Sequence, residues 1–197
     1  VERHGEGIRL NVLATEGSSE NVRRLNANQL DLATIGGGTP VVSNVRLVSH
    51  LFSDFFNVIA RSDARIRRFG DLKGKLIALP PDGSAGLRRF WAVADLYDLP
   101  SQTVRFVSMP FEAAHNALLN KQVDAVFTLS SLRDRPLLAL FEDAELTNVS
   151  LEVIPVEQAE AISLKRPFVV PDRIPRGAFT GAIPAPRWET TTATIRR

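Results

Sequence analysis

Short apolar runs alternate with amphipathic segments along most of this chain. Residues 76–79 form an apolar run of strand length, which two prolines end before a glycine- and serine-rich turn at residues 82–86. After the turn, Leu87, Phe90, Trp91 and Ala94 are spaced so that they lie on one face of a helix. The pattern predicts a strand, a tight turn and a helix in succession.

The same alternation predicts further elements on both sides of this stretch. Strands are predicted at residues 8–14, 30–35, 46–61 (as one long or two short strands), 103–109, 123–129, 150–156 and 190–195. Helices are predicted at residues 22–28, 111–122, 136–141 and 157–164. From Lys165 onward prolines recur, which predicts an extended tail that runs over the surface. Alternating strands and helices indicate an α/β fold, with a parallel or mixed sheet flanked by helices.

A phrase recurs at two places and predicts two similar lobes. Residues 28–33 and 120–126 each pass from a polar turn into a strand that opens with an aspartate, and a Gly-Ser corner precedes each, at residues 17–18 and 83–84. A chance match is the alternative. We predict lobe 1 at residues 1–60, lobe 2 at residues 61–160, and a tail at residues 161–197 that returns toward lobe 1. Lobes of this kind bind ligands at the carboxyl ends of their strands.

Composition and charge narrow the class of protein. The chain has 197 residues, of which 44% are apolar, so it can bury a core. Its net charge of +2 comes from dispersed Lys and Arg residues, which does not favour nucleic acid as a partner. The sequence has zero cysteines and no apolar run of membrane-spanning length. Residues 1–4 lack a signal-peptide pattern and an initiator Met, which predicts a cytoplasmic protein or one whose targeting segment has been removed.

Two glycine-containing turns are candidate ligand-binding corners. Gly83 and Gly86 carry no Cβ, so backbone N–H groups there can approach a ligand, and Ser84 adds a hydroxyl at a predicted helix start. Such a corner suits an anion, although a plain helix cap has the same pattern. The run of glycines at residues 36–38 also permits close approach, with a flexible loop as the alternative.

Catalytic and metal-binding patterns are absent from the sequence. Residues 70–75 lack the glycine spacing and the Ser or Thr of a phosphate-binding loop. Residues 83–86 do not form a nucleophile elbow, and residues 36–38 lack the glycine order of a dinucleotide turn. The three histidines are isolated from one another and from other ligand types. We therefore expect no enzyme activity, no metal and no cofactor.

Short motifs spread over residues 8–195 resemble the TAXI family of solute-binding receptors. They are Glu16-Gly17-Ser18-Ser19-Glu20-Asn21, Asp31-Leu32-Ala33, Asp71-Leu72-Lys73-Gly74-Lys75, Gly83-Ser84-Ala85-Gly86, Val123-Asp124-Ala125 with Phe127, and Pro167-Phe168 with Ile174-Pro175-Arg176-Gly177-Ala178-Phe179. These receptors are type II periplasmic binding proteins that serve TRAP transporters. The chain departs from the family at Gly86, where a Thr is usual, and at Ser130-Ser131, where Gly-x-Pro is usual. The family's first strand is missing before Ile8.

The resemblance implies a two-lobed periplasmic or membrane-tethered receptor that closes on a small anionic solute, such as an amino acid or a dicarboxylate. TRAP membrane subunits would be its partners. Carried over to this chain, the family's ligand contacts would be Ser18, Ser19, Asn21, Gly83, Ser84 and Ala85. We add four candidate ligand-binding residues that the resemblance does not supply: Gly37, Arg88, Ser130 and Ser131. Arg88 would pair with a carboxylate, and a solvated position is its alternative.

Two other functions fit the same fold. The first is a ligand-sensing domain of a membrane receptor or of a transcriptional regulator. The second is an enzyme on the same scaffold, similar to the pyrimidine-synthesis relatives of type II binding proteins, which would need a nucleophile or base in the cleft.

Overall fold

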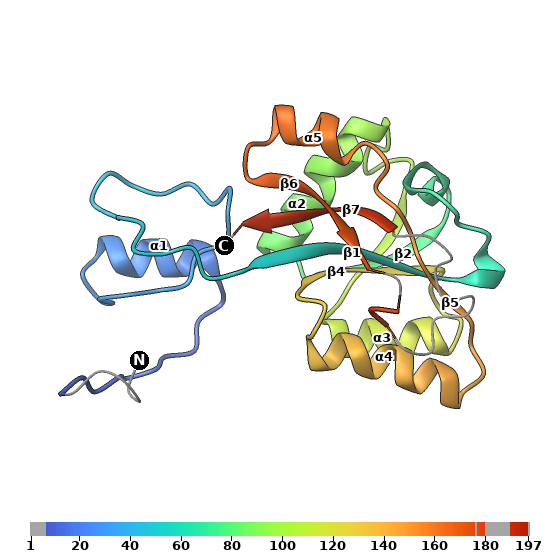
Figure 1. Ribbon diagram of the computed structural model, residues 1–197, viewed down its shortest axis with the longest axis horizontal. Coiled ribbons are helices and arrows are strands. Elements are labelled where there is room, and N and C mark those ends of the chain that lie inside the picture. Colours follow the sequence, from blue (N-terminus) through green and yellow to red (C-terminus); the bar gives the residue numbers. More distant parts are fainter. Residues whose placement is uncertain (1–6, 176, 180–189, 197) are drawn as a thin grey trace.

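A computed structural model of the chain describes residues 7–175, 177–179 and 190–196, and its elements follow the predicted alternation (Figure 1). The helices are α1 (Ser18–Asn26), α2 (Ala85–Ala94), α3 (Phe111–Leu119), α4 (Arg135–Leu146) and α5 (Ala159–Lys165). The strands are β1 (Ser53–Arg61), β2 (Leu76–Leu79), β3 (Arg105–Ser108), β4 (Ala125–Ser130), β5 (Leu151–Val153), β6 (Val169–Ile174) and β7 (Thr190–Arg196). Short 3-10 helices lie at Ser62–Ala64, Phe69–Leu72 and Asp95–Tyr97.

The strands form one mixed sheet in the order β3-β2-β4-β1-β7-β6, with β5 paired to β1. β2 is parallel to β3 and β4, whereas β1 is antiparallel to β4, β5 and β7. Figure 1 shows α2 and α5 on one face of the sheet and α3 and α4 on the other. The predicted α/β fold with a mixed sheet between helices is confirmed.

The core consists of two apolar clusters, one on each face of the sheet. Because successive side chains of a strand point to opposite faces, Phe56 and Val58 of β1 pack toward α2, while Ile59 packs toward α3 and α4. On the α2 face Phe56 lies 4.4 Å from Phe127 between ring centroids. None of the described residues before residue 53 belongs to either cluster.

The strands predicted at residues 8–14 and 30–35 do not form, and the strand predicted at residues 46–61 begins only at Ser53. Among the described residues these stretches have no neighbouring strand to pair with, and an extended segment without a partner leaves its backbone groups to water. Several of their apolar side chains are exposed, with Val12 at 86% and Leu32 at 67%. The alternation of apolar and polar residues therefore predicted strands that do not form among the described residues.

After Lys165 the strand predicted at residues 190–195 is confirmed as β7, whereas the prediction that the preceding tail runs over the surface is wrong for the part that joins the sheet as β6. β6 and β7 pair with each other, and β7 pairs with β1 at the centre of the sheet. Val169, Ile174 and Phe179 are buried, and Phe179 stacks on Phe141. β6 is an edge strand, so the missing N–H of Pro171 does not break a ladder on its outer side. Pro184 and Pro186 lie outside the described residues.

Candidate functional site

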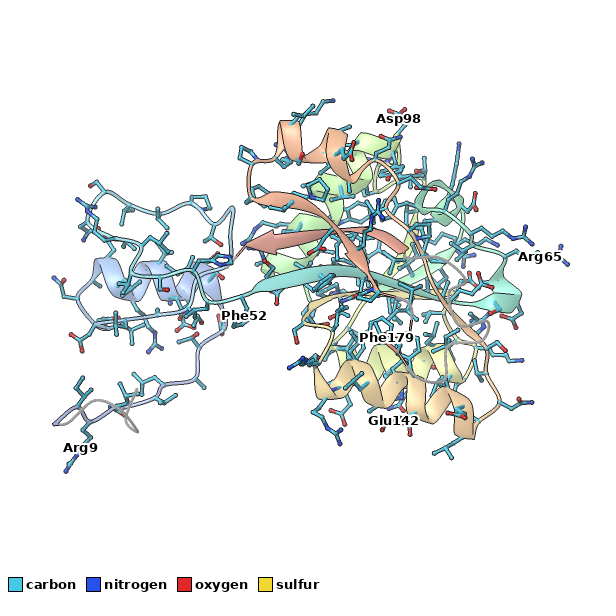
Figure 2. The ribbon with its side chains drawn as sticks, in the orientation of Figure 1. Arg9, Phe52, Arg65, Asp98, Glu142 and Phe179 are labelled. Carbon is cyan, nitrogen blue, oxygen red and sulfur yellow. The ribbon has the colours of Figure 1, made fainter. Side chains whose placement is uncertain are left out.

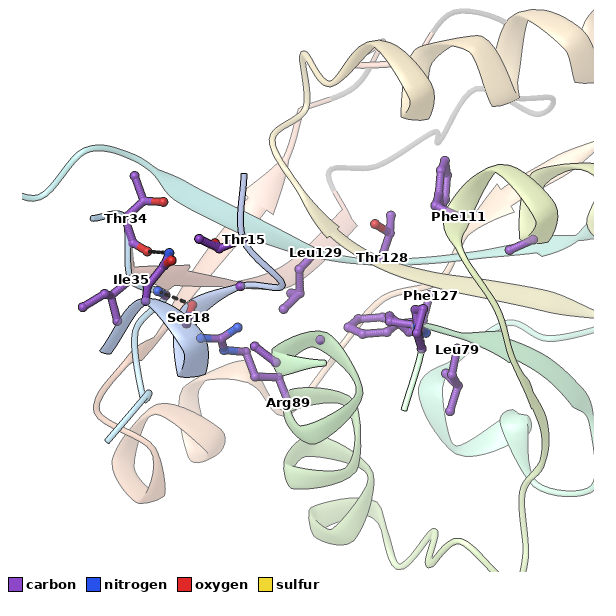
Figure 3. Close-up of a pocket in the computed structure, with 18 of the residues that line it drawn as sticks. Thr15, Ser18, Thr34, Ile35, Leu79, Arg89, Phe111, Phe127, Thr128 and Leu129 are labelled. Atoms are coloured by element: carbon purple, nitrogen blue, oxygen red, sulfur yellow. Dashed lines mark hydrogen bonds between the residues drawn. The ribbon is translucent and has the colours of Figure 1, made fainter. Parts of the chain in front are cut away.

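A cavity of about 430 Å³ lies where α1 and the segment after it meet the sheet (Figure 3). It opens beside the carboxyl ends of the parallel strands β2 and β3, which is the usual place for a ligand in an α/β sheet. The lining residues are Thr15, Gly17, Ser18, Asn21, Thr34, Ile35, Gly36, Leu79, Pro80, Pro81, Ala85, Gly86, Arg89, Met109, Phe111, Ala114, Phe127, Thr128 and Leu129.

One wall of the cavity is built by side chains of α1 that hold the segment 34–36. The Ser18 hydroxyl oxygen accepts a hydrogen bond from the Gly36 N–H at 3.0 Å. The Asn21 side-chain amide donates to the Thr34 carbonyl at 2.9 Å, and Asn21 is itself buried. These bonds fix residues 34–36, which form no regular element, against the first turn of a helix.

The turn before α1 is held by Glu20. Its carboxylate accepts hydrogen bonds from the Glu16 N–H at 2.6 Å and from the Arg24 side chain at 2.7 Å. Both partners stabilise the charged form, the Glu16 N–H most strongly, and they lower the pKa of Glu20 from its ordinary value of 4.5. The carboxylate thus orders residues 16–20 at the cavity edge without lining the cavity.

The opposite corner is the start of α2. Ser84 is the N-cap, and its hydroxyl oxygen accepts a hydrogen bond from the Leu87 N–H at 3.1 Å. Arg88 donates to the Gly83 carbonyl at 2.9 Å and to the Ser19 hydroxyl at 3.3 Å. Arg88 therefore connects the two Gly-Ser corners, which lie at the same cavity.

Arg89 is the one charged side chain among the described lining residues, and the sequence did not lead us to predict it as a site residue. Its Nε and Nη2 donate to the Gly37 carbonyl at 3.2 and 2.6 Å. A Cβ on Gly36 would lie 2.5 Å from Nη2, so this guanidinium position requires glycine at residue 36. The available signal was helical spacing: Arg89 follows Ala85 and Gly86 by four and three residues and so shares their face.

The sequence reasoning also missed the apolar wall of the cavity. Leu79 ends β2, Met109 directly follows β3, and Phe111 begins α3. Phe127 and Leu129 belong to β4. The signal in the sequence was the place of these residues at or near the carboxyl ends of predicted strands.

The residues predicted to bind ligand fall into three groups. Three line the cavity: Ser18, Asn21 and Ala85. Five lie next to the cavity: Ser19, Gly37, Gly83, Ser84 and Arg88. Ser84 caps α2, Arg88 donates to Gly83 and Ser19, and Gly37 accepts from the lining residue Arg89. Two do not line it. Ser130 is buried and accepts a hydrogen bond from the Asn57 amide, and the Ser131 hydroxyl accepts one from the Arg133 N–H.

The electrostatics of the cavity favour negative charge. The first turns of α1, α2 and α3 all contribute lining residues, and a helix N-terminus carries partial positive charge. Arg89 adds a full positive charge, and no Asp or Glu of the described chain belongs to the lining. In the ranges 7–175, 177–179 and 190–196, the acidic, His and Cys side chains form no group of three that could hold a metal ion.

The chain shares its mixed sheet between helices with solved periplasmic solute-binding proteins. The periplasmic aliphatic sulphonate binding protein SsuA from Escherichia coli has this fold and is 16% identical to the chain. The match covers 70% of this chain and 46% of that one, with a TM-score of 0.50, so the chain spans about half of that protein's length. The chain belongs to the NMT1-like family, which matches residues 2–186.

Other solute-binding proteins match more of the chain at lower TM-scores. An ancestral arginine-binding protein bound to arginine is 16% identical, with 90% of this chain and 62% of that one covered and a TM-score of 0.46. The substrate binding protein of an amino acid ABC transporter is 15% identical, with 97% and 67% covered and a TM-score of 0.49. Across the described part of the chain, every helix is too short or too polar to cross a membrane.

Proposed function

We propose that this chain captures a small anionic solute in the cavity and presents it to a membrane transporter in the periplasm. The observation that supports this most is Arg89, the single positive side chain among the described lining residues, in a cavity ringed by helix N-termini. The cavity volume of about 430 Å³ falls in the range of small-molecule sites.

The proposed contacts come from both sides of the cavity. Ser18, Ser19 and Asn21 would contribute from α1, and Gly83, Ser84, Ala85 and Arg88 from the start of α2. The resemblance to the TAXI family implies the contacts of Ser18, Ser19, Asn21, Gly83, Ser84 and Ala85. Gly37 is added because its carbonyl accepts from Arg89, whereas Ser130 and Ser131 do not line the cavity and are not proposed as contacts. The same resemblance supports a TRAP-type transporter as the partner and an amino acid or a dicarboxylate as the starting class of solute.

Native mass spectrometry of freshly purified protein tests the proposal. We expect a bound species of low mass, which denaturation releases and which small-molecule mass spectrometry in negative-ion mode then identifies. The Ala85→Trp variant should lose this species, because Ala85 lines the cavity and the indole would fill it.

Ala113→Trp is the matched control for Ala85→Trp, because Ala113 is an exposed residue of α3 outside the cavity lining. It should retain the bound species. The proposal would be overturned by a protein that carries no solute and whose unfolding temperature is unchanged by a panel of small carboxylates and sulfonates.

A further inference from the structure

We propose that the cavity binds an uncharged hydroxyl group of the solute at Thr128, with the buried Asn57 side chain next to Thr128 as a positioning residue. This inference rests on the proposed function and deepens it, because it names a second group that the anionic solute carries. Polar side chains that interrupt the apolar face of the sheet at the cavity support it.

Asn57, Thr128 and Ser130 are polar residues on the face of the sheet that α3 and α4 cover. Side chains of a strand alternate between faces, and both Ile59 of β1 and Val126 of β4 belong to the apolar cluster on this face. Asn57 and Thr128 are directly opposite each other in the antiparallel pair of β1 and β4. The Cβ atoms of such a pair are about 5 Å apart. The two side chains are therefore neighbours.

The side-chain oxygen of Asn57 is a buried acceptor that lacks a donor. Asn57 is 0% exposed, and its Nδ2 donates to the Ser130 carbonyl at 3.3 Å and to the Phe55 carbonyl at 3.2 Å. Because two carbonyl oxygens accept from this end of the amide, it is the nitrogen end. Oδ1 has no hydrogen-bond partner among the described residues. A buried acceptor without a donor costs free energy, so it requires an explanation such as a bound ligand.

Thr128 links Asn57 to the cavity. Thr128 is a lining residue, and Figure 3 shows its side chain between Leu129 and Phe111. Its hydroxyl has no hydrogen-bond partner in the described part of the chain. A hydroxyl can accept one hydrogen bond and donate another. A solute group that donates to Thr128 Oγ1 thus directs the Thr128 proton toward Asn57 Oδ1, and both side chains gain a partner.

The surroundings of Thr128 favour an uncharged donor. α3 begins at the same cavity with Phe111, and its N-cap Pro110 makes no side-chain cap bond, so this helix end presents partial positive charge. That charge disfavours an ammonium group. A carboxylate suits the helix end but has no proton to donate to Thr128. A hydroxyl group has both a lone pair for the helix end and a proton for Thr128.

Calorimetry with four six-carbon probes on the intact chain tests the proposal. The probes are 6-hydroxyhexanoate, hexanoate, adipate and 6-aminohexanoate, which share a carboxylate and differ in the group at the other end. 6-Hydroxyhexanoate should bind about tenfold more tightly than each of the other three. Equal or tighter binding of any of the three would overturn the inference while the proposed solute-binding function stands.

Variants of the two residues test their roles. Thr128→Val removes the hydroxyl and keeps the branched shape, so the preference for 6-hydroxyhexanoate over hexanoate should fall from about tenfold to about one, and Thr128→Ser should restore most of it. Asn57→Leu should also reduce the preference. The matched control is Thr103→Val, because Thr103 precedes β3 and lies outside the lining. It should keep the preference of the parent protein.

An undiminished preference in Thr128→Val would overturn the role of Thr128. If that variant fails to fold, Thr128→Ser and the four probes on the parent protein decide. If none of the probes binds, the solute found by native mass spectrometry decides: one with a hydroxyl group supports the inference, and one without it overturns the inference alone. Absence of both probe binding and a bound solute would overturn the inference and the proposed function together.

Discussion

The guanidinium of Arg89 is held in place by a residue that has no side chain. It donates twice to the Gly37 carbonyl and lies across Gly36, where a Cβ would approach Nη2 to 2.5 Å. Gly36 does not adopt the left-handed backbone conformation, so its need for glycine is a matter of space and not of φ. A methyl group at residue 36 would therefore displace the guanidinium from its present position.

Gly36→Ala should therefore affect binding more than stability. The clash is with the end of a flexible side chain, so we expect the free energy of unfolding to change by less than about 1 kcal/mol. Affinity for the proposed anionic solute should fall, because Arg89 must leave the Gly37 carbonyl. Urea denaturation and calorimetry measure the two effects.

The control for this variant is Gly70→Ala. A Cβ at Gly70 would meet no atom within 4 Å, and the backbone there is not left-handed. The substitution should leave both the stability and the affinity close to those of the parent protein. Equal affinities of Gly36→Ala and the parent protein would show that Gly36 does not control the position of Arg89.

At the scale of single elements, α2 shows how a local motif can have a structural role beside a binding site. The Ser84 hydroxyl caps the helix by accepting from the Leu87 N–H, while Ala85 and Gly86, the next two residues, line the cavity. Both interpretations of the corner at residues 83–86 describe part of it: the serine caps the helix, and the first helical turn faces the cavity.

Ser84→Ala should destabilise the protein by about 1 kcal/mol, because the Leu87 N–H loses its partner at the start of α2. Ser84→Asn should be close to the parent protein, since an asparagine oxygen also caps a helix. The measurement is the free energy of unfolding in urea for the two variants. Equal stability of Ser84→Ala and Ser84→Asn would contradict a capping role.

At the scale of the whole molecule, the chain divides into a packed sheet and an N-terminal part that adds one wall of the cavity. Both core clusters are built from residues after residue 53 in the described chain. Residues 7–52 are joined to them by contacts such as Arg89 with Gly37 and Arg88 with Ser19. Figure 1 shows α1 set to one side of the sheet, and Figure 2 shows the side chains crowded within the sheet and its helices.

A fragment of residues 53–197 should therefore fold and lose binding. We expect cooperative unfolding with a midpoint only about 4–8 °C below that of the whole chain, the equivalent of about 2 kcal/mol for this size. Binding of the proposed anionic solute should disappear, because the fragment lacks Ser18, Asn21 and the segment 34–36 of the lining. Circular dichroism and calorimetry measure these properties. An unfolded fragment would contradict the division.

The sequence by itself determined the elements whose apolar runs could pair or pack locally in this chain. Residues 76–79 and 123–129 contain parallel neighbours in the sheet, and the aspartate that opens the second strand accepts from the Leu76 N–H through its carboxylate. The matching phrase at residues 28–33 has the same aspartate, Asp31, but forms no strand. The same sequence motif therefore forms a strand at its second copy, where β2 is available to pair with it, and not at its first copy.

Only the tertiary structure decided which side chains meet at the cavity. Helical spacing put Arg88 and Arg89 one residue apart, about 100° around the helix, and the packing of α2 turned Arg89 toward the cavity and Arg88 toward Ser19. The apolar wall likewise joins residues from β2, α3 and β4 that lie far apart in the chain. Periodicity along a sequence predicts faces, whereas the partner of each face is set by long-range packing.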